Sequence, residues 1–404
     1  MAAGKSYDIV LFGATGFTGE LTAEYLARAA TREDFRWAIA GRNELKLERL
    51  RKRLSAINPD LRDSLGLVIA DINDEASLAA MAQAARVVVT TAGPYIHFGE
   101  PVLRACVENG ADYADLTGEP EYVNEMLAKY GRQATDNKLR IVNCCGFDSI
   151  PHDLGAWFTV QELTKGESRT DAAREVISVE GFVRAGGTFS GGTWHSAIHA
   201  FSRARHLARQ SSRRKSSDRP SRVVKSTMPK LTYRSELGTW VCPFPTIDPQ
   251  VVKRSARAIE EYGQSFEYGH YVQVKKLPKL VLGVAAIGGI FTLAQLPWTR
   301  NWLLSLKGQG EGPSRTQMEK GWFQVTFVGR SKHKRVMTRV SGGDPGYGET
   351  SKMLAESALC LALDRRRLPQ RHGILTPAAA MGRALYERLD QAGIRFEVLE
   401  QDAV

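Results

Sequence analysis

The chain has 404 residues, more than one hydrophobic core usually fills, so two domains are expected. Hydrophobic residues make up 43% and charged residues 25%, which is typical of a soluble globular protein. The five cysteines form no C-x-x-C pair and no metal-ligand spacing, so we expect free thiols in a cytoplasmic protein and no metal site. The N-terminus is polar within eight residues, so no secretory signal peptide is expected.

The formal net charge of +11 is concentrated in one segment, residues 203–234. This basic segment contains eleven Lys or Arg residues and a single acid, Asp218. It is either a solvated loop or a contact for an anionic partner, namely lipid headgroups or an acidic protein. We expect no nucleic-acid partner, because no aromatic residue interleaves the basic ones before Tyr233.

The first 150 residues alternate between short apolar runs and amphipathic helical patterns. The predicted strands are Tyr7–Phe12, Phe35–Ala40, Leu65–Ala70, Arg86–Thr91, Tyr113–Leu116 and Arg140–Cys145. Such alternation predicts an α/β fold with a Rossmann-type, doubly wound parallel sheet.

The strand–helix alternation ends near residue 155, and a helical pattern returns near the C-terminus. Residues 1–155 are predicted to form the nucleotide-binding domain, and residues 156–345 an inserted α+β domain for a substrate or partner. Strands are expected there at Val176–Val183, Phe266–Val274, Trp322–Val328 and Lys334–Val340. Residues 346–404 are predicted to return to the first domain as helices, one of them starting with Thr376 as its cap and Pro377 in its first turn.

An apolar segment without any charge covers residues 280–298 inside the inserted domain. Basic residues flank both ends, and Gly283, Gly288, Gly289 and Pro297 interrupt it. These features argue against a simple membrane span and leave two alternatives, a buried core helix or a contact within the plane of a membrane. The second alternative would place the protein peripherally at the inner face of the plasma membrane.

The sequence GATGFTG, Gly13–Gly19, follows the first predicted strand and opens the first predicted helix. In this context Gly13 permits a tight turn, Gly16 leaves room for a pyrophosphate, and Gly19 lets the helix pack on the strand. The helix N-terminus adds N–H donors and a favourable dipole. The motif therefore predicts a dinucleotide site.

The end of the second strand indicates which dinucleotide is bound. An NAD site usually has an acidic residue there for the ribose hydroxyls, whereas this chain has Arg42, with Lys46 one helical turn later. A guanidinium at this position suits a 2′-phosphate, so NADP is the expected cofactor. Asp71 either meets the adenine amino group or is an ordinary loop residue. The residues expected to hold the cofactor are Gly13, Thr15, Gly16, Phe17, Gly19, Arg42, Asp71, Thr91 and Gly93.

Three further loops are expected at the carboxyl edge of the sheet, where ligands bind in this fold. The loop Thr90–Gly99 carries Tyr95 and His97, which are the candidate proton donors, with Tyr95 preferred. The other two loops supply four additional candidates for the same cleft: Asp115, Glu119, Asp148 and His152.

Eight motifs together resemble the saccharopine dehydrogenase-like oxidoreductases, and more closely their bacterial trans-acting enoyl reductase branch. They are GATGFTG (13–19), AGR (40–42), TTAGPY (90–95), YADLTGE (113–119), CGFDSIPHDL (145–154), FSGGT (189–193), DPGYGETSKML (344–354) and LTPAAAMG (375–382).

The resemblance implies an NAD(P)-type reductase, and in the named branch one that reduces the double bond of an enoyl thioester. In the named branch the thioester is delivered by a polyketide synthase, on an acyl carrier domain, during assembly of cell-envelope glycolipids. Two alternatives remain open. One is a saccharopine-type dehydrogenase of amino acids or imines, and the other is a non-catalytic NADP-binding scaffold at a membrane or lipid surface.

Overall fold

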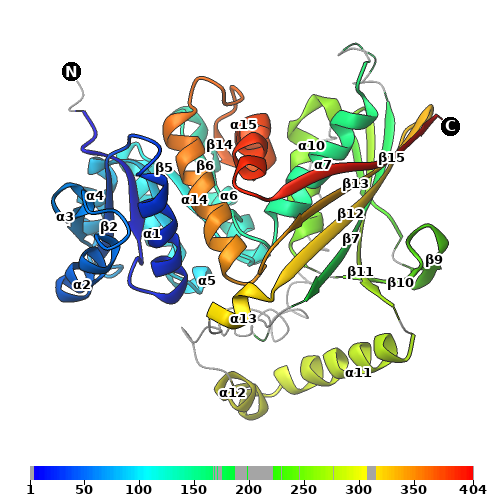
Figure 1. Cartoon of the computed structure of the whole chain (residues 1–404), viewed down its shortest axis with the longest axis horizontal. Helices are drawn as coiled ribbons and strands as arrows, with labels where there is room; N and C mark the ends of the chain where they lie inside the picture. Colours follow the sequence, from blue (N-terminus) through cyan, green and yellow to red (C-terminus); the bar gives the residue numbers. More distant parts are fainter. Residues whose placement is uncertain are drawn as a thin grey trace. The chain divides into compact units, whose positions relative to one another are not determined.

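The computed structural model describes residues 4–166, 168, 171, 175–186, 198, 222–228, 230–244, 246–275, 277–306 and 315–403. Most of the basic segment, residues 203–221, and the FSGGT motif lie outside the described residues. The chain divides into two compact units, the first formed by Met1–Ile150 with Tyr347–Gly393 and the second by Pro151–Gly346 with Ile394–Val404. The chain therefore leaves the first unit after Ile150, returns to it at Tyr347, and ends in the second unit (Figure 1).

A parallel seven-stranded sheet forms the core of the first unit, with the strand order β14-β6-β5-β4-β1-β2-β3. Its strands are β1 (Tyr7–Phe12), β2 (Trp37–Gly41), β3 (Gly66–Ile69), β4 (Ala85–Thr90), β5 (Asp112–Asp115), β6 (Arg140–Val142) and β14 (Gly373–Leu375). The predicted Rossmann-type sheet is confirmed. The order reverses between β1 and β4, and in such sheets ligands bind at this point, beyond the carboxyl ends of the strands.

Helices cover this sheet because its central strands are buried over most of their length. All residues of β2 are buried, as are the last four of β1 and the last four of β4. The helices of the unit are α1 (Phe17–Ala29), α2 (Glu44–Leu54), α3 (Leu61–Ser64), α4 (Glu75–Ala84), α5 (Tyr95–Asn109), α6 (Pro120–Asp136), α14 (Gly348–Leu363) and α15 (Pro377–Gln391). The expected cap of α15 is present, because the Thr376 hydroxyl accepts from Ala379 N at 3.4 Å.

The second unit contains a mixed sheet with the order β15-β13-β12-β7-β11-β10-β9, and β8 pairs with β11. Its strands are β7 (Val176–Gly186), β8 (Val223–Ser226), β9 (Thr232–Arg234), β10 (Thr239–Pro243), β11 (Ser265–Val274), β12 (Trp322–Arg330), β13 (Lys334–Gly342) and β15 (Arg395–Ala403). Its helices are α7 (Ile150–Leu163), α10 (Asp248–Ala258), α11 (Leu277–Ala294), α12 (Pro297–Ser305) and α13 (Arg315–Glu319), with short 3-10 turns at Ser235–Leu237 and Glu260–Tyr262.

The C-terminal end of the chain differs from the expected organisation. The return to the first unit ends at Gly393, whereas residues 394–404 belong to the second unit. The reason is that β15 pairs antiparallel with β13 from Ser341↔Arg395 to Lys334↔Ala403. Its sequence, RFEVLEQDA, mixes polar and apolar residues, so it gave no strong strand pattern.

The apolar segment 280–298 is divided between two helices rather than forming one. Pro297 starts α12 after an extended residue, Leu296, since proline cannot continue the preceding helix. Before Ile290, the residues of α11 whose burial the structure describes, among them Leu277, Ala285 and Ala286, are exposed. In the part of the chain that the structure describes, no helix is both long enough and apolar enough to cross a membrane.

Candidate functional site

The turn between β1 and α1 is built as the sequence predicted. Gly13 N donates to Ala40 O at 3.0 Å, and Gly13 adopts φ +79°, a conformation that glycine accepts without strain. Gly16 N donates to Gly13 O at 3.1 Å, and Gly16 then becomes the N-cap residue of α1. The chain thus passes from strand to helix within four residues.

Gly19 is the residue of this turn that tolerates no side chain. A Cβ atom at Gly19 would lie 2.2 Å from Gly13 O and 2.9 Å from Ala14 Cα, which are both backbone atoms. Gly16 differs, because a Cβ there would lie 3.4 Å from its nearest neighbour, Gly13 O. Gly19 therefore brings α1 against the turn, whereas the space beside Gly16 is open for a ligand.

The N-terminus of α1 fits an anionic group. Among the described residues, no side chain caps this helix. Its first-turn N–H groups and the positive end of its dipole are directed at the turn, as a pyrophosphate requires. Thr91 closes the other side of the turn, with its hydroxyl 3.1 Å from Gly13 O.

Arg42 and Lys46 are both exposed beside the end of β2. Asn43 caps α2 by accepting from Lys46 N at 3.0 Å, so the helix start is stabilised without the two basic side chains. Arg42 forms no ion pair or hydrogen bond within the described part of the chain. Its guanidinium is therefore available for a phosphate at this edge.

Asp71 is used locally. Its Oδ1 accepts from Asn73 N at 2.9 Å and from Asn73 Nδ2 at 3.3 Å, which forms an Asx turn before α4. The geometry accounts for Asp71 as a loop residue and supplies nothing that directs it to adenine.

The loop after β4 places the two candidate proton donors differently. Tyr95 is buried, and its hydroxyl donates to Thr90 O at 2.9 Å. Burial raises the pKa of Tyr95 well above its usual value, with nearby Asp115 acting in the same direction. In this geometry Tyr95 is a structural residue, whereas His97 is exposed on the first turn of α5.

Glu119 has a role that the sequence did not reveal. Its carboxylate accepts from Tyr95 N at 2.9 Å and from Ile96 N at 3.0 Å. A carboxylate from the loop after β5 therefore caps α5, and it fixes the loop that carries His97.

Asp115 joins the carboxyl ends of β5 and β6. Its carboxylate accepts from Cys144 N at 3.0 Å, Asn143 Nδ2 at 2.7 Å, Thr117 N at 3.1 Å and the Tyr113 hydroxyl at 2.9 Å. Burial raises the pKa of Asp115 to about 6, against the opposing effect of these donors. Asp115 thus shapes the edge from inside and does not face a ligand.

The helix α14 completes the surroundings of the turn from a distant part of the sequence. The rings of Phe17 and Tyr347 meet edge to face, with centroids 4.6 Å apart. The Ser351 hydroxyl lies 3.5 Å from Thr18 O, and the Thr350 hydroxyl accepts from Phe147 N at 3.2 Å. The motif DPGYGETSKML therefore supports the turn. In the sequence it stood out only as a motif of unusual composition, without an assigned role.

His152 lies in the second unit, in a cluster that sequence spacing did not predict. Its Nδ1 is 2.8 Å from Asp248 Oδ1, and His270 Nε2 is 3.5 Å from Asp248 Oδ2. The three buried side chains are close enough to share a metal ion. The Thr246 hydroxyl contacts both Asp248 Oδ2 and His270 Nε2, so hydrogen bonds hold the part of the cluster formed by Asp248 and His270. Burial lowers the pKa of His270 to about 3 and keeps it neutral.

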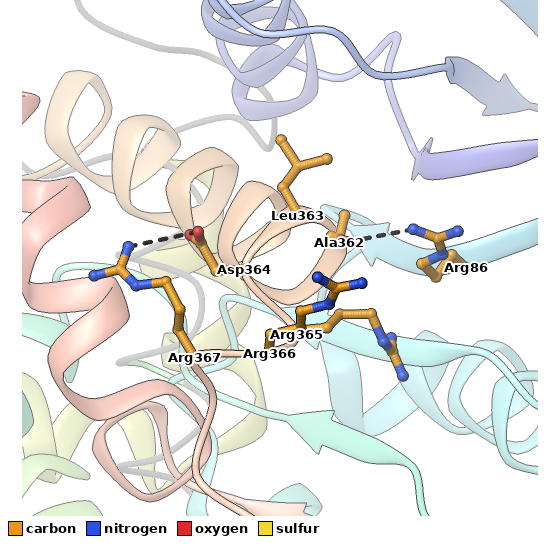
Figure 2. A pocket seen from close by; sticks show the side chains of 7 residues that line it. All are labelled: Arg86, Ala362, Leu363, Asp364, Arg365, Arg366 and Arg367. Carbon is orange, nitrogen blue, oxygen red and sulfur yellow. Dashed lines mark hydrogen bonds and ion pairs between the residues drawn. The ribbon is translucent and has the colours of Figure 1, made fainter.

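A separate hollow of about 470 Å³ lies at the opposite edge of the first sheet (Figure 2). It is lined by Arg86, at the start of β4, and by residues 362–367. Several of its arginines are neutralised, since Arg365 contacts Asp112 at 2.6 Å and Arg367 contacts Asp364 at 3.6 Å. The hollow lies at the amino ends of the strands and has no part in the glycine turn.

Comparisons with known proteins show the family of the chain. Residues 9–142 match the family model of the saccharopine dehydrogenase NADP-binding domain. The chain is 32% identical to a saccharopine dehydrogenase-like oxidoreductase of Bos taurus, with 99% of each chain covered. The chain belongs to the saccharopine dehydrogenase-like oxidoreductase family. It is an NADP-binding oxidoreductase, and NADP is its cofactor.

Two further relatives carry an enoyl reductase name. The chain is 36% identical to a relative from Mycobacterium tuberculosis named, provisionally, as a trans-acting enoyl reductase, with 98% of each chain covered. It is 32% identical to the trans-acting enoyl reductase of Mycobacterium ulcerans, with 97% of this chain and 98% of the relative covered.

A solved structure shows the same fold over the whole chain. Apo saccharopine dehydrogenase (L-Glu forming) from Saccharomyces cerevisiae superposes with a TM-score of 0.53 at 13% identity, covering 98% of this chain and 99% of that one. The similarity shows that the two chains share a fold.

Proposed function

We propose that this oxidoreductase reduces the carbon–carbon double bond of an enoyl thioester with NADPH. The observation that carries the proposal is the full-length similarity to the two mycobacterial relatives with an enoyl reductase name, one of them at 36% identity. The loops at the carboxyl edge of the sheet, where the glycine turn lies, also favour an enoyl thioester over a saccharopine-type substrate. Their motifs provide no dense basic group for a dicarboxylate.

The proposed site uses the backbone more than side chains. The first turn of α1 holds the pyrophosphate beside Gly16, and Arg42 contacts the 2′-phosphate. When bound, NADPH supplies a hydride to the β-carbon of the double bond. As the π bond breaks, negative charge develops on the thioester oxygen, and the α-carbon accepts a proton to give the saturated thioester.

His97 is the proposed proton donor for the α-carbon. It is exposed on the first turn of α5, and Glu119 fixes the backbone of that turn. Tyr95, the donor preferred from the sequence, already donates its hydroxyl proton to Thr90 O. The geometry thus favours His97 over Tyr95.

The test is NADPH consumption with a panel of enoyl thioesters, presented on coenzyme A and on an acyl carrier domain. We expect oxidation of NADPH with formation of the saturated thioester, and faster turnover if the carrier domain is the partner. NADPH binding without turnover of any thioester would favour the scaffold alternative. Oxidation of saccharopine or a related secondary amine would replace the proposal with a saccharopine-type activity.

The proton donor is tested separately on any substrate found. His97→Gln is expected to lower kcat at least tenfold with unchanged NADPH affinity, because the residue does not contact the nucleotide turn. Tyr95→Phe is the matched comparison and is expected to affect stability more than kcat. The reverse pattern would restore Tyr95 as the donor.

A further inference from the structure

The helix pair α11–α12 presents large apolar side chains that nothing in the described chain covers. Exposed large side chains occur at intervals of four residues along α12 and at its C-cap: Trp298, Trp302 and Leu306 are 73%, 54% and 56% exposed. The opposite face packs inward, since Thr299 and Leu303 are 4% and 2% exposed. Side chains four residues apart lie on one side of a helix, so the exposed residues form a continuous stripe.

Two leucines that precede Trp298 in the sequence are also exposed. Leu296 is 49% exposed at the start of α12, and Leu293 is 36% exposed near the end of α11. We call these five residues the apolar face: Leu293, Leu296, Trp298, Trp302 and Leu306. Monomeric globular proteins rarely expose an apolar group of this size, and those that do usually have a partner there.

The charged residues in the sequence of this segment indicate the chemistry of that partner. From Tyr268 to Gly310 the sequence has no Asp or Glu, and it has five basic residues: Lys275, Lys276, Lys279, Arg300 and Lys307. Lys275 is exposed just before α11, and Arg300 is half-buried on α12. A helix pair whose sequence contains tryptophans, leucines and basic residues but no acid matches an anionic lipid interface, where tryptophan rings lie at the level of the headgroups.

The junction between the two helices indicates how they would contact a lipid surface. The break at Leu296–Pro297 separates α11 from α12, and Ala294 and Leu303 pack with Ile198 in one small buried cluster. The pair is therefore held to its own unit at their junction, with the tryptophan side outward. This geometry suits helices lying in the plane of a membrane surface.

We propose that the apolar face of α11–α12 docks on an anionic lipid surface, with Trp298 and Trp302 inserted at the headgroup level. This docking goes beyond the proposed reductase activity and does not depend on it. It would bring an NADP-dependent oxidoreductase to lipid-soluble acyl substrates.

The experiment is flotation of the full-length protein with vesicles of phosphatidylcholine, with and without phosphatidylserine. We expect the wild type to float with the anionic vesicles, and at least tenfold less with neutral ones or at high salt. Trp298→Ser/Trp302→Ser is expected to reduce flotation on anionic vesicles at least tenfold. The matched control is Leu45→Ser/Met228→Ser, which removes side chains that are 66% and 75% exposed elsewhere, and it is expected to float like the wild type.

NADPH affinity serves as the check on folding, because the glycine turn lies in the other unit. The proposal is overturned if the tryptophan double variant binds NADPH normally and floats as well as the wild type. It is also overturned if the wild type is a dimer in solution that the double variant converts to a monomer, since a second copy would then cover the face. Equal flotation on neutral and anionic vesicles would overturn the assignment of an anionic surface.

Discussion

The two edges of the parallel sheet differ in what they offer a ligand. The amino edge has a hollow lined by arginines (Figure 2), which by charge and volume alone would suit an anion. The carboxyl edge has the glycine turn and the uncapped N-terminus of α1. At the amino edge the guanidinium groups of Arg365 and Arg367 are paired with Asp112 and Asp364, whereas at the carboxyl edge Arg42 has no partner among the described residues.

The comparison shows that a hollow lined by several basic residues is not by itself an anion-binding site. What matters is whether donors remain unsatisfied by the protein itself. Backbone N–H groups at a helix start are such donors by construction, since the helix cannot pair them. The variants below separate the two edges.

The largest effect is expected for Gly19→Ala. The added Cβ would lie 2.2 Å from Gly13 O, so α1 or the turn must shift. We expect a loss of about 3 kcal/mol or more in the free energy of unfolding and no measurable NADPH binding. The measurements are urea unfolding and fluorescence titration with NADPH. Gly16→Ala is the control, which should unfold like the wild type but bind NADPH at least tenfold more weakly; normal NADPH binding by either variant would contradict the site.

Arg388→Ala tests the ion pairs near the opposite edge. Arg388 contacts Glu33 at 2.7 Å and Glu356 at 3.2 Å, and it also pairs with Asp364. Its removal leaves these acids without their shared cation, so we expect a loss of about 3 kcal/mol in stability and unchanged NADPH affinity. Arg383→Ala is the exposed control and should change stability by less than about 0.5 kcal/mol. Equal effects of the two would show that burial of the network is unimportant.

Asp115 predicts a dependence of stability on pH. Its pKa of about 6 in the folded protein exceeds the ordinary value of 3.8, so the folded state holds the proton more tightly. The free energy of unfolding should therefore fall as pH rises from about 4 to 6, by ~2 kcal/mol from this group. Urea unfolding at several pH values measures it, and Asp115→Asn, which cannot ionise, should lose this part of the slope. A slope unchanged in the variant would assign the effect to another group.

Arg42→Gln addresses cofactor choice at the carboxyl edge. Loss of a charge-assisted contact to the 2′-phosphate should weaken NADPH binding roughly 10- to 100-fold. NADH lacks that phosphate, so its affinity should stay within twofold. Arg49→Gln, an exposed arginine on α2, is the matched control and should leave both affinities unchanged. Equal weakening of NADPH and NADH would remove the proposed role of Arg42.

The smallest effect is expected for Arg366→Ala, which removes an exposed arginine that lines the amino-edge hollow. NADPH affinity should stay within twofold and stability within about 0.5 kcal/mol. A tenfold loss of NADPH affinity would place the nucleotide at this edge instead.

The local sequence alone determined the glycine turn, the parallel sheet around it and the cofactor. These features depend on neighbouring residues: the apolar period of β1, the spacing of Gly13, Gly16 and Gly19, and Arg42 at the end of β2. The cap of α15 by Thr376 was predictable for the same reason. Short-range geometry is fixed by a few successive residues.

Only the tertiary structure decided the roles of residues whose partners are distant in sequence. The sequence suggested Tyr95 as a proton donor, but in the structure its hydroxyl donates to Thr90 O. Glu119 caps a helix that begins 24 positions earlier in the sequence. β15 becomes a strand only because β13 offers an edge. The exposure of Trp298 and Trp302 on one side of α12 likewise emerged only from packing. Burial and pairing between residues far apart in the sequence determine which polar groups stay free. The local sequence pattern does not reveal these long-range partners.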